Sequence, residues 1–94
     1  MNSRIPDIND AIQLHRSGKL DEAEALYQRI LLAQPQHADA LHLLGLIALQ
    51  RKKFGEAEKL IRSAIALNKR ACEYRNSLGN VLFEQKLFDE AEQQ

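Results

Sequence analysis

The side chains that could do chemistry in this 94-residue sequence are three histidines, one cysteine and scattered acids. A catalytic or metal centre needs such groups to converge, and zinc ligands come in short characteristic spacings. His37 and His42 lie five positions apart, which places them on different sides of a helix, and His15 lies out of register with both. We therefore predict no catalytic residue, no metal site, no cofactor and no enzyme activity in this chain.

Neither the cysteine nor the glycines indicate a disulfide or a phosphate-binding site. Cys72 has no partner for an internal disulfide, which favours a reducing, cytoplasmic location. It is expected to open a helix, where the pKa of a thiol can fall, so its reactivity stays an open question. The four glycines are isolated from one another, and a phosphate-binding loop needs them clustered.

Composition excludes two further classes of partner. Lys plus Arg and Asp plus Glu both total 13, so no charge excess attracts nucleic acid or an anionic membrane. The five aromatic residues are scattered among acids, unlike a base-stacking surface. The apolar run Leu43 to Leu49 is far shorter than a membrane span, and the first residues lack a secretory segment. We expect a cytoplasmic protein that binds neither nucleic acid nor membrane.

A 34-residue repeat organises the sequence. Shifting the chain by 34 positions aligns Leu20 to Glu24 with Phe54 to Glu58 and with Phe88 to Glu92, which read LDEAE, FGEAE and FDEAE. The same shift carries Leu44-Gly45 onto Leu78-Gly79. A sustained period of this length is typical of stacked supersecondary units that bury their apolar faces against one another.

Each unit has the pattern of a helical hairpin. Leu41, Leu44, Gly45 and Ala48 follow the spacing of an amphipathic helix, and a second apolar series follows a short polar turn. The pattern predicts helices over 6–17, 20–34, 38–51, 54–68 and 72–85, and a truncated helix over 88–94.

Local signals predict where these helices turn and end. Gly18 suits a left-handed turn, and Pro35 should end the second helix. Lys69 replaces that proline in the middle unit, so the fourth helix is expected to run longer there. Asp21 and Glu24 have capping-box spacing, and acids open each second helix, including Asp89-Glu90.

Small residues recur at two positions of the repeat. They should let paired helices approach closely, and they are Ala11, Gly45 and Gly79 on the first helices and Ala23, Ala57 and Ala91 on the second.

These features together resemble the tetratricopeptide repeat (TPR) family. Its pattern of Leu-Gly, Ala, an apolar residue and Ala is matched in the middle unit by Leu44-Gly45, Ala57, Ile61 and Ala64. The resemblance implies an all-α fold, a right-handed solenoid of helix-turn-helix repeats. We expect one domain over 1–94, about two and two-thirds repeats, with units at 4–37, 38–71 and a truncated 72–94. The first unit departs from the pattern at Asp7 and Asp10, and the third at Arg75.

The resemblance also implies a function, which is binding a protein or peptide in the concave groove formed by the first helices. The residues implied as partner-binding are Ile8, Ile12, His15, Arg16, Asp39, His42, Leu46, Leu49, Gln50, Glu73, Asn76, Asn80, Phe83 and Glu84, with Ile5 beside them. The carboxylate clamp of chaperone-binding relatives is absent, because Ile8 and Ile12 occupy its positions. An alternative is that some of these side chains pack within the array or against a neighbouring copy.

Two functions stay open at this stage. One is an interaction scaffold, and the other is the substrate-recruiting arm of a transferase. The segment Glu73 to Asn80 resembles repeats that precede glycosyltransferase-like or sulfotransferase-like domains. A homo-oligomer through the C-terminal end is a further expectation, because a solenoid is normally closed by a polar capping element and this sequence shows none. The alternative is a monomer whose C-terminal tail is disordered.

Overall fold

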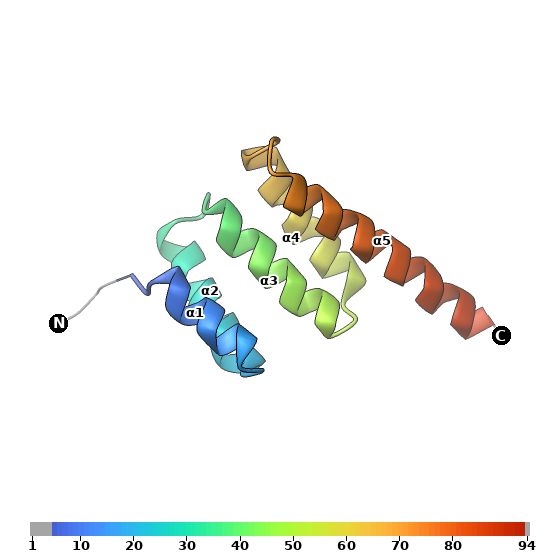
Figure 1. Cartoon of the computed structure of the whole chain (residues 1–94), viewed down its shortest axis with the longest axis horizontal. Coiled ribbons are helices and arrows are strands. Elements are labelled where there is room, and N and C mark those ends of the chain that lie inside the picture. The colour runs from blue at the N-terminus through green and yellow to red at the C-terminus, as the bar shows by residue number, and fades with distance from the viewer. Residues whose placement is uncertain (1–4, 94) are drawn as a thin grey trace.

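The computed structural model describes residues 5–93, which form five α-helices and no strand. The helices are α1 (Ile8–Arg16), α2 (Leu20–Ala33), α3 (Ala38–Gln50), α4 (Phe54–Leu67) and α5 (Cys72–Gln93). Helices α1 and α2 form one antiparallel hairpin, α3 and α4 form a second, and α5 packs against α4 (Figure 1). The predicted all-α repeat fold is confirmed.

The second helices of the two hairpins repeat with the period of the sequence. Both the starts and the ends of α2 and α4 are separated by 34 residues. Pro35 follows the end of α2, as predicted. The expected lengthening of α4 is wrong, because the side chain of Asn68 accepts a hydrogen bond from the backbone N–H of Arg70 at 3.2 Å and forms a turn there.

The turns inside the hairpins use a left-handed residue at equivalent positions. Gly18 has φ +81°, as predicted, and Lys52 has φ +62°. Their counterpart in the third unit, Lys86, stays helical within α5. The predicted separate helix over 88–94 is therefore wrong for residues 88–93, which continue α5, and Gln94 lies outside the described residues.

The balance of contacts explains why α5 does not turn. A left-handed conformation costs a non-glycine residue roughly 1–2 kcal/mol, and a turn also breaks helical hydrogen bonds. Residues 88–93 contain only Phe88 and Ala91 as apolar side chains to offset that cost. In the continuous helix Phe88 already packs against Phe54, with ring centroids 5.4 Å apart.

The predicted helix caps are only partly correct. Helix α2 begins after Lys19, which makes no side-chain capping bond, so the Asp21/Glu24 capping box is wrong. Asp21 and Glu56 do lie in the first turns of α2 and α4, where acids suit the partial positive charge of a helix start. Asp89 and Glu90 lie inside α5, so their predicted place at a helix start is also wrong.

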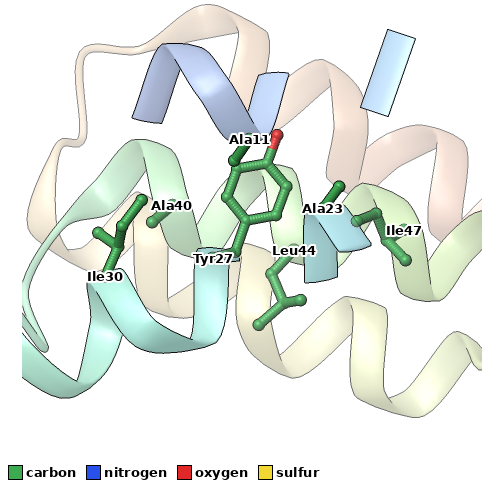
Figure 2. Packing of buried hydrophobic residues seen from close by; sticks show 7 residues of the cluster. All are labelled: Ala11, Ala23, Tyr27, Ile30, Ala40, Leu44 and Ile47. Atoms are coloured by element: carbon green, nitrogen blue, oxygen red, sulfur yellow. The ribbon is translucent and has the colours of Figure 1, made fainter. Parts of the chain in front are cut away.

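The core forms where small residues let the helices approach. Figure 2 shows the first cluster, in which Tyr27 of α2 points between Ala11 of α1 and the residues of α3. Burial raises the pKa of the Tyr27 phenol to about 12. In the second hairpin, a Cβ added to Gly45 would lie 2.7 Å from Cγ1 of Ile61. The close approach predicted at these positions is confirmed in the first two units.

The third unit lacks this packing. A Cβ added to Gly79 would meet no atom within 4 Å, and Ala91 is exposed. Because α5 continues to Gln93, none of the described residues folds back over Gly79. The close approach predicted for Gly79 and Ala91 is therefore wrong for residues 5–93.

Candidate protein-binding face

The first helices of the repeats, α1, α3 and α5, lie side by side (Figure 1). Side chains 35 residues apart join them, one more than the sequence period. Nε2 of His15 lies 2.9 Å from Oε1 of Gln50, and Nε2 of His42 lies 2.7 Å from Oγ of Ser77. These contacts fix the spacing between neighbouring first helices.

His15 uses both ring nitrogens in this network. Its Nδ1 lies 3.3 Å from the hydroxyl of Tyr27, on the side of the ring opposite to the Gln50 contact. The ring is half-buried between α1 and α3. Its place in the network gives His15 a structural role, which is linking the first two repeats.

His42 lies at the centre of a second polar cluster. The residue is 6% exposed, and its ring packs against the ring of Tyr74 with centroids 4.6 Å apart and planes tilted by 37°. Burial lowers the pKa of His42, and the charges of Glu73 and Asp39 oppose that shift only in part. The ring is therefore neutral near pH 7 and links α3 to α5.

Tyr74 completes this cluster and was not singled out as a site residue from the sequence. Its hydroxyl donates a hydrogen bond to Oδ1 of Asp39, again 35 residues away. Burial, followed by the hydrogen bond to Asp39, raises the pKa of the phenol. Asp39 and Tyr74, like His42 and Ser77, are 35 residues apart, one more than the period of the sequence, so the repeat alone did not indicate these pairs.

The remaining residues of the predicted site differ in how far they are buried. Leu49 is 9% exposed in the cluster that Phe54 and Ile61 help to form, and Ile8 packs partly against the first cluster. Ile12, Leu46 and Glu84 are half-buried. The exposed members are Arg16, Asp39, Gln50, Glu73, Asn76, Asn80 and Phe83, with Ile5 beside them. We call Ile12, Arg16, Leu46, Gln50, Asn76 and Asn80 the first-helix face.

Ion pairs brace the helices behind this face. Arg51 donates to Glu24 of α2 at 2.7 Å and also to Asp21, and the hydrogen bond to Glu24 is the main reason that the pKa of Arg51 is raised. Lys52 lies 3.4 Å from Glu84 of α5. These pairs could not be predicted from the local sequence, because the partners of Arg51 lie 27 and 30 residues away.

Across residues 5–93, no three His, Cys, Asp or Glu side chains are gathered so that they could hold a metal ion. In that same span no helix is both long enough and apolar enough to cross a bilayer.

Comparison with known proteins assigns the family. The profile described as "Tetratricopeptide repeat" matches residues 11–69 and 53–94, which together include every helix except the first turn of α1. The chain belongs to the tetratricopeptide repeat family. The right-handed α-solenoid expected from the sequence is the architecture of this TPR chain, and the match indicates a non-catalytic repeat domain.

Two proteins that are similar to this chain are much longer than it is. Human "Tetratricopeptide repeat protein 7B" is 38% identical over 65 residues, which are 69% of this chain and 8% of the human protein. A mutant O-GlcNAc transferase from Thermobaculum terrenum superposes with a TM-score of 0.79 at 37% identity, covering 80% of this chain and 14% of the transferase chain. This TPR chain thus spans a small part of both.

Proposed function

We propose that this TPR chain is an interaction scaffold whose first-helix face binds a segment of a partner protein. The observation that carries the proposal is the accessibility of Ile12 and Leu46. They hold the same repeat position on adjacent helices and stay half-exposed, while His42 and Leu49 beside them are buried. Polar Arg16 and Gln50 lie one turn further along the same two helices, and Asn76 and Asn80 lie on α5.

This arrangement suits an extended or helical peptide with apolar anchors. Such a segment would cover Ile12 and Leu46 with its apolar side chains. The amides of Asn76 and Asn80 both donate and accept, so they can bond to peptide backbone. Gln50 can donate from its amide nitrogen while its Oε1 stays in contact with His15. The contacts of His15 and His42 hold the helices in place before binding, which lowers the ordering cost.

The proposal includes the remaining properties expected from the sequence. The chain acts as one domain without catalysis, cofactor or bound metal, and its partner is a protein or peptide rather than nucleic acid or membrane. A cytoplasmic location, where the exposed Cys72 would stay reduced, belongs to the same proposal.

A peptide selection tests this function. A phage-displayed random peptide library is selected on the immobilised chain, and the dissociation constants of the recovered peptides are measured by calorimetry. Leu46→Lys should weaken binding about tenfold or more, which corresponds to about 1.4 kcal/mol. Leu32→Lys is the matched control, because Leu32 lies on α2 and is 84% exposed.

The affinities of the Leu46→Lys and Leu32→Lys variants show whether the peptide binds at Leu46. Equal affinity of the Leu46→Lys variant, with its helical circular dichroism unchanged, would place the binding surface elsewhere. Leu49 is unsuitable for this test, since a charge at that buried position would destabilise the core.

A second candidate function rests on the similarity to the O-GlcNAc transferase. In that reading the TPR repeats recruit protein substrates for a transferase domain in the same polypeptide. The reading frame that encodes these residues decides whether such a domain exists. If it does, Leu46→Lys should lower transfer to protein substrates while transfer to a short acceptor peptide stays unchanged, and a frame without a transferase rejects this candidate.

A further inference from the structure

The three histidines of the sequence all hold α3, the helix that carries Leu46 of the first-helix face. His37 lies immediately before the first residue of α3, and His42 lies within the helix. Nε2 of His15 contacts Oε1 of Gln50 in the last turn of α3. Histidine is the side chain whose charge ordinarily changes between about pH 5 and 8. The contacts of these three rings therefore decide how α3 responds to acid.

His37 caps the N-terminus of α3 with a ring nitrogen. The backbone N–H of Ala40 donates a hydrogen bond to Nδ1 of His37, with the two nitrogens 3.2 Å apart. A ring nitrogen that accepts a hydrogen bond carries no proton, whereas both nitrogens of a protonated imidazole donate. Protonation would thus remove the cap and place a positive charge at the helix end that is already partly positive. The capped start of α3 requires a neutral His37.

His42 joins the same half of α3 to α5. Its Nε2 lies 2.7 Å from Oγ of Ser77, and the buried ring packs against Tyr74. Burial lowers the pKa of His42 more than the charges of Glu73 on α5 and Asp39 on α3 raise it. A charged ring would recover its hydration by moving away from α5, because burying a charge is costly. The contact between α3 and α5 also requires a neutral histidine.

His15 differs from the other two histidines because its contacts tolerate a proton. Its Nε2 lies 2.9 Å from Oε1 of Gln50, and its Nδ1 lies 3.3 Å from the hydroxyl of Tyr27. When both ring nitrogens donate, the amide oxygen and the tyrosine hydroxyl can both accept. His15 is therefore an internal comparison for the other two rings.

We infer that acid weakens partner binding by releasing the first half of α3 from its cap and from α5. This inference rests on the proposed function, because the first-helix face has Leu46 on α3 and Asn76 and Asn80 on α5. The contact of His42 with Ser77 aligns these two helices. When protonation breaks the alignment and the cap, fewer chains present the complete face, and the apparent affinity falls with that fraction.

The direction of the pH dependence follows from the neutral rings. Both His37 and His42 contribute to the binding-competent state only without a proton. Burial lowers the pKa of His42 from the value of about 6.5 for a free histidine. Partner affinity is therefore highest above about pH 6.5 and falls as the pH decreases below that value.

Calorimetry at pH 7.5 and pH 5.5 tests the regulation with a selected peptide that contains no His, Asp or Glu. The dissociation constant should rise about threefold or more at the lower pH, because the competent fraction falls. His37→Asn combined with His42→Gln should reduce this rise, since Asn is a preferred N-cap and neither new side chain titrates there. His15→Gln, the matched control, should show the same rise as the unchanged chain. Equal dissociation constants at both pH values, or an undiminished rise in the double variant, would overturn the inference.

The Cα chemical shifts of residues 38–42 report the start of α3 without any partner. In the unchanged chain they should move from helical toward coil values between pH 7.5 and pH 5.5. In the single variant His37→Asn, which keeps a preferred cap residue, they should move less. Shifts that stay helical in the unchanged chain would overturn the inference even if a peptide binds at Leu46. Failure of the first-helix face would be seen separately, as equal affinity of the Leu46→Lys variant at pH 7.5.

Discussion

At the scale of single residues, Gly45 and Gly79 occupy the same repeat position in opposite surroundings. A Cβ on Gly45 would meet Cγ1 of Ile61 at 2.7 Å and the carbonyl oxygen of Ala57 at 3.3 Å, whereas Gly79 has open space. Gly45→Ala should lower the free energy of unfolding by about 1 kcal/mol, because overpacking of roughly 1–3 kcal/mol exceeds the gain in helix propensity. Urea denaturation measures the change.

Gly79→Ala is the control for that prediction. The substitution adds a methyl group in a helix interior without a clash, so it should raise the free energy of unfolding by roughly 0.5–1 kcal/mol. Opposite signs for the two variants support the packing difference between α3 and α5. A loss at Gly79 as large as the loss at Gly45 would mean that a helix covers α5 in solution within each chain.

His42 should make stability depend on pH. Burial holds its pKa in the folded state below the unfolded value of about 6.5, so the folded state binds fewer protons. The contribution of His42 to the free energy of unfolding is complete above about pH 6.5 and falls as the pH decreases below that value. The ring of His42 contacts Tyr74 and Ser77. The nearby acids Asp39 and Glu73 reduce the lowering of its pKa without reversing it.

The measurement compares urea midpoints at pH 7.5 and pH 5.5. The unchanged chain should lose stability at the lower pH, and His42→Gln should lose less between the same two values. A midpoint that rises on acidification in the unchanged chain would contradict a depressed pKa for His42.

At the scale of elements, the turn between α3 and α4 carries a left-handed lysine. Lys52 has φ +62°, a conformation that glycine adopts without the penalty of roughly 1–2 kcal/mol. Lys52→Gly should therefore raise the free energy of unfolding by about 1 kcal/mol, as measured by thermal denaturation. Lys86→Gly, the same substitution within helical α5, should instead lower helicity and stability, and identical effects would contradict the assignment of the turn.

Much of the helix pattern was predictable from the 34-residue period. The bounds of α2 and α4 follow from repeated Ala and apolar positions and from Pro35, because these features act locally or within one hairpin. The turn near Lys86 was predicted wrongly from the same period. Whether it forms depends on the apolar surface that residues 88–93 could bury, which Phe88 uses against Phe54.

The candidate face was predictable in position but not in accessibility. Repeat register placed Ile12 and Leu46 on the first helices, where the structure finds them half-exposed. It could not show that His42 and Leu49 are buried, because the burial of His42 depends on Tyr74 and Ser77 of the next repeat, and that of Leu49 on its packing against α4. The polar pairs join residues that are 35 positions apart because neighbouring hairpins are offset along their axes. That offset is set by three-dimensional packing.

At the scale of the whole molecule, the first-helix face spans neighbouring repeats. It runs across α1, α3 and α5 and is braced by the contacts of His15 and His42. In the proposed function, one partner segment therefore contacts residues of more than one repeat at once.

The most direct test of the proposed binding face is to map where a selected peptide binds by two-dimensional NMR. The backbone amides of an isotope-labelled chain are followed as the peptide is added. The proposal predicts the largest shift changes at Ile12, Leu46 and Gln50, with Asn80 included and Leu32 unchanged. Shift changes confined to the outer sides of α2 and α4, with Leu46 unaffected, would contradict it.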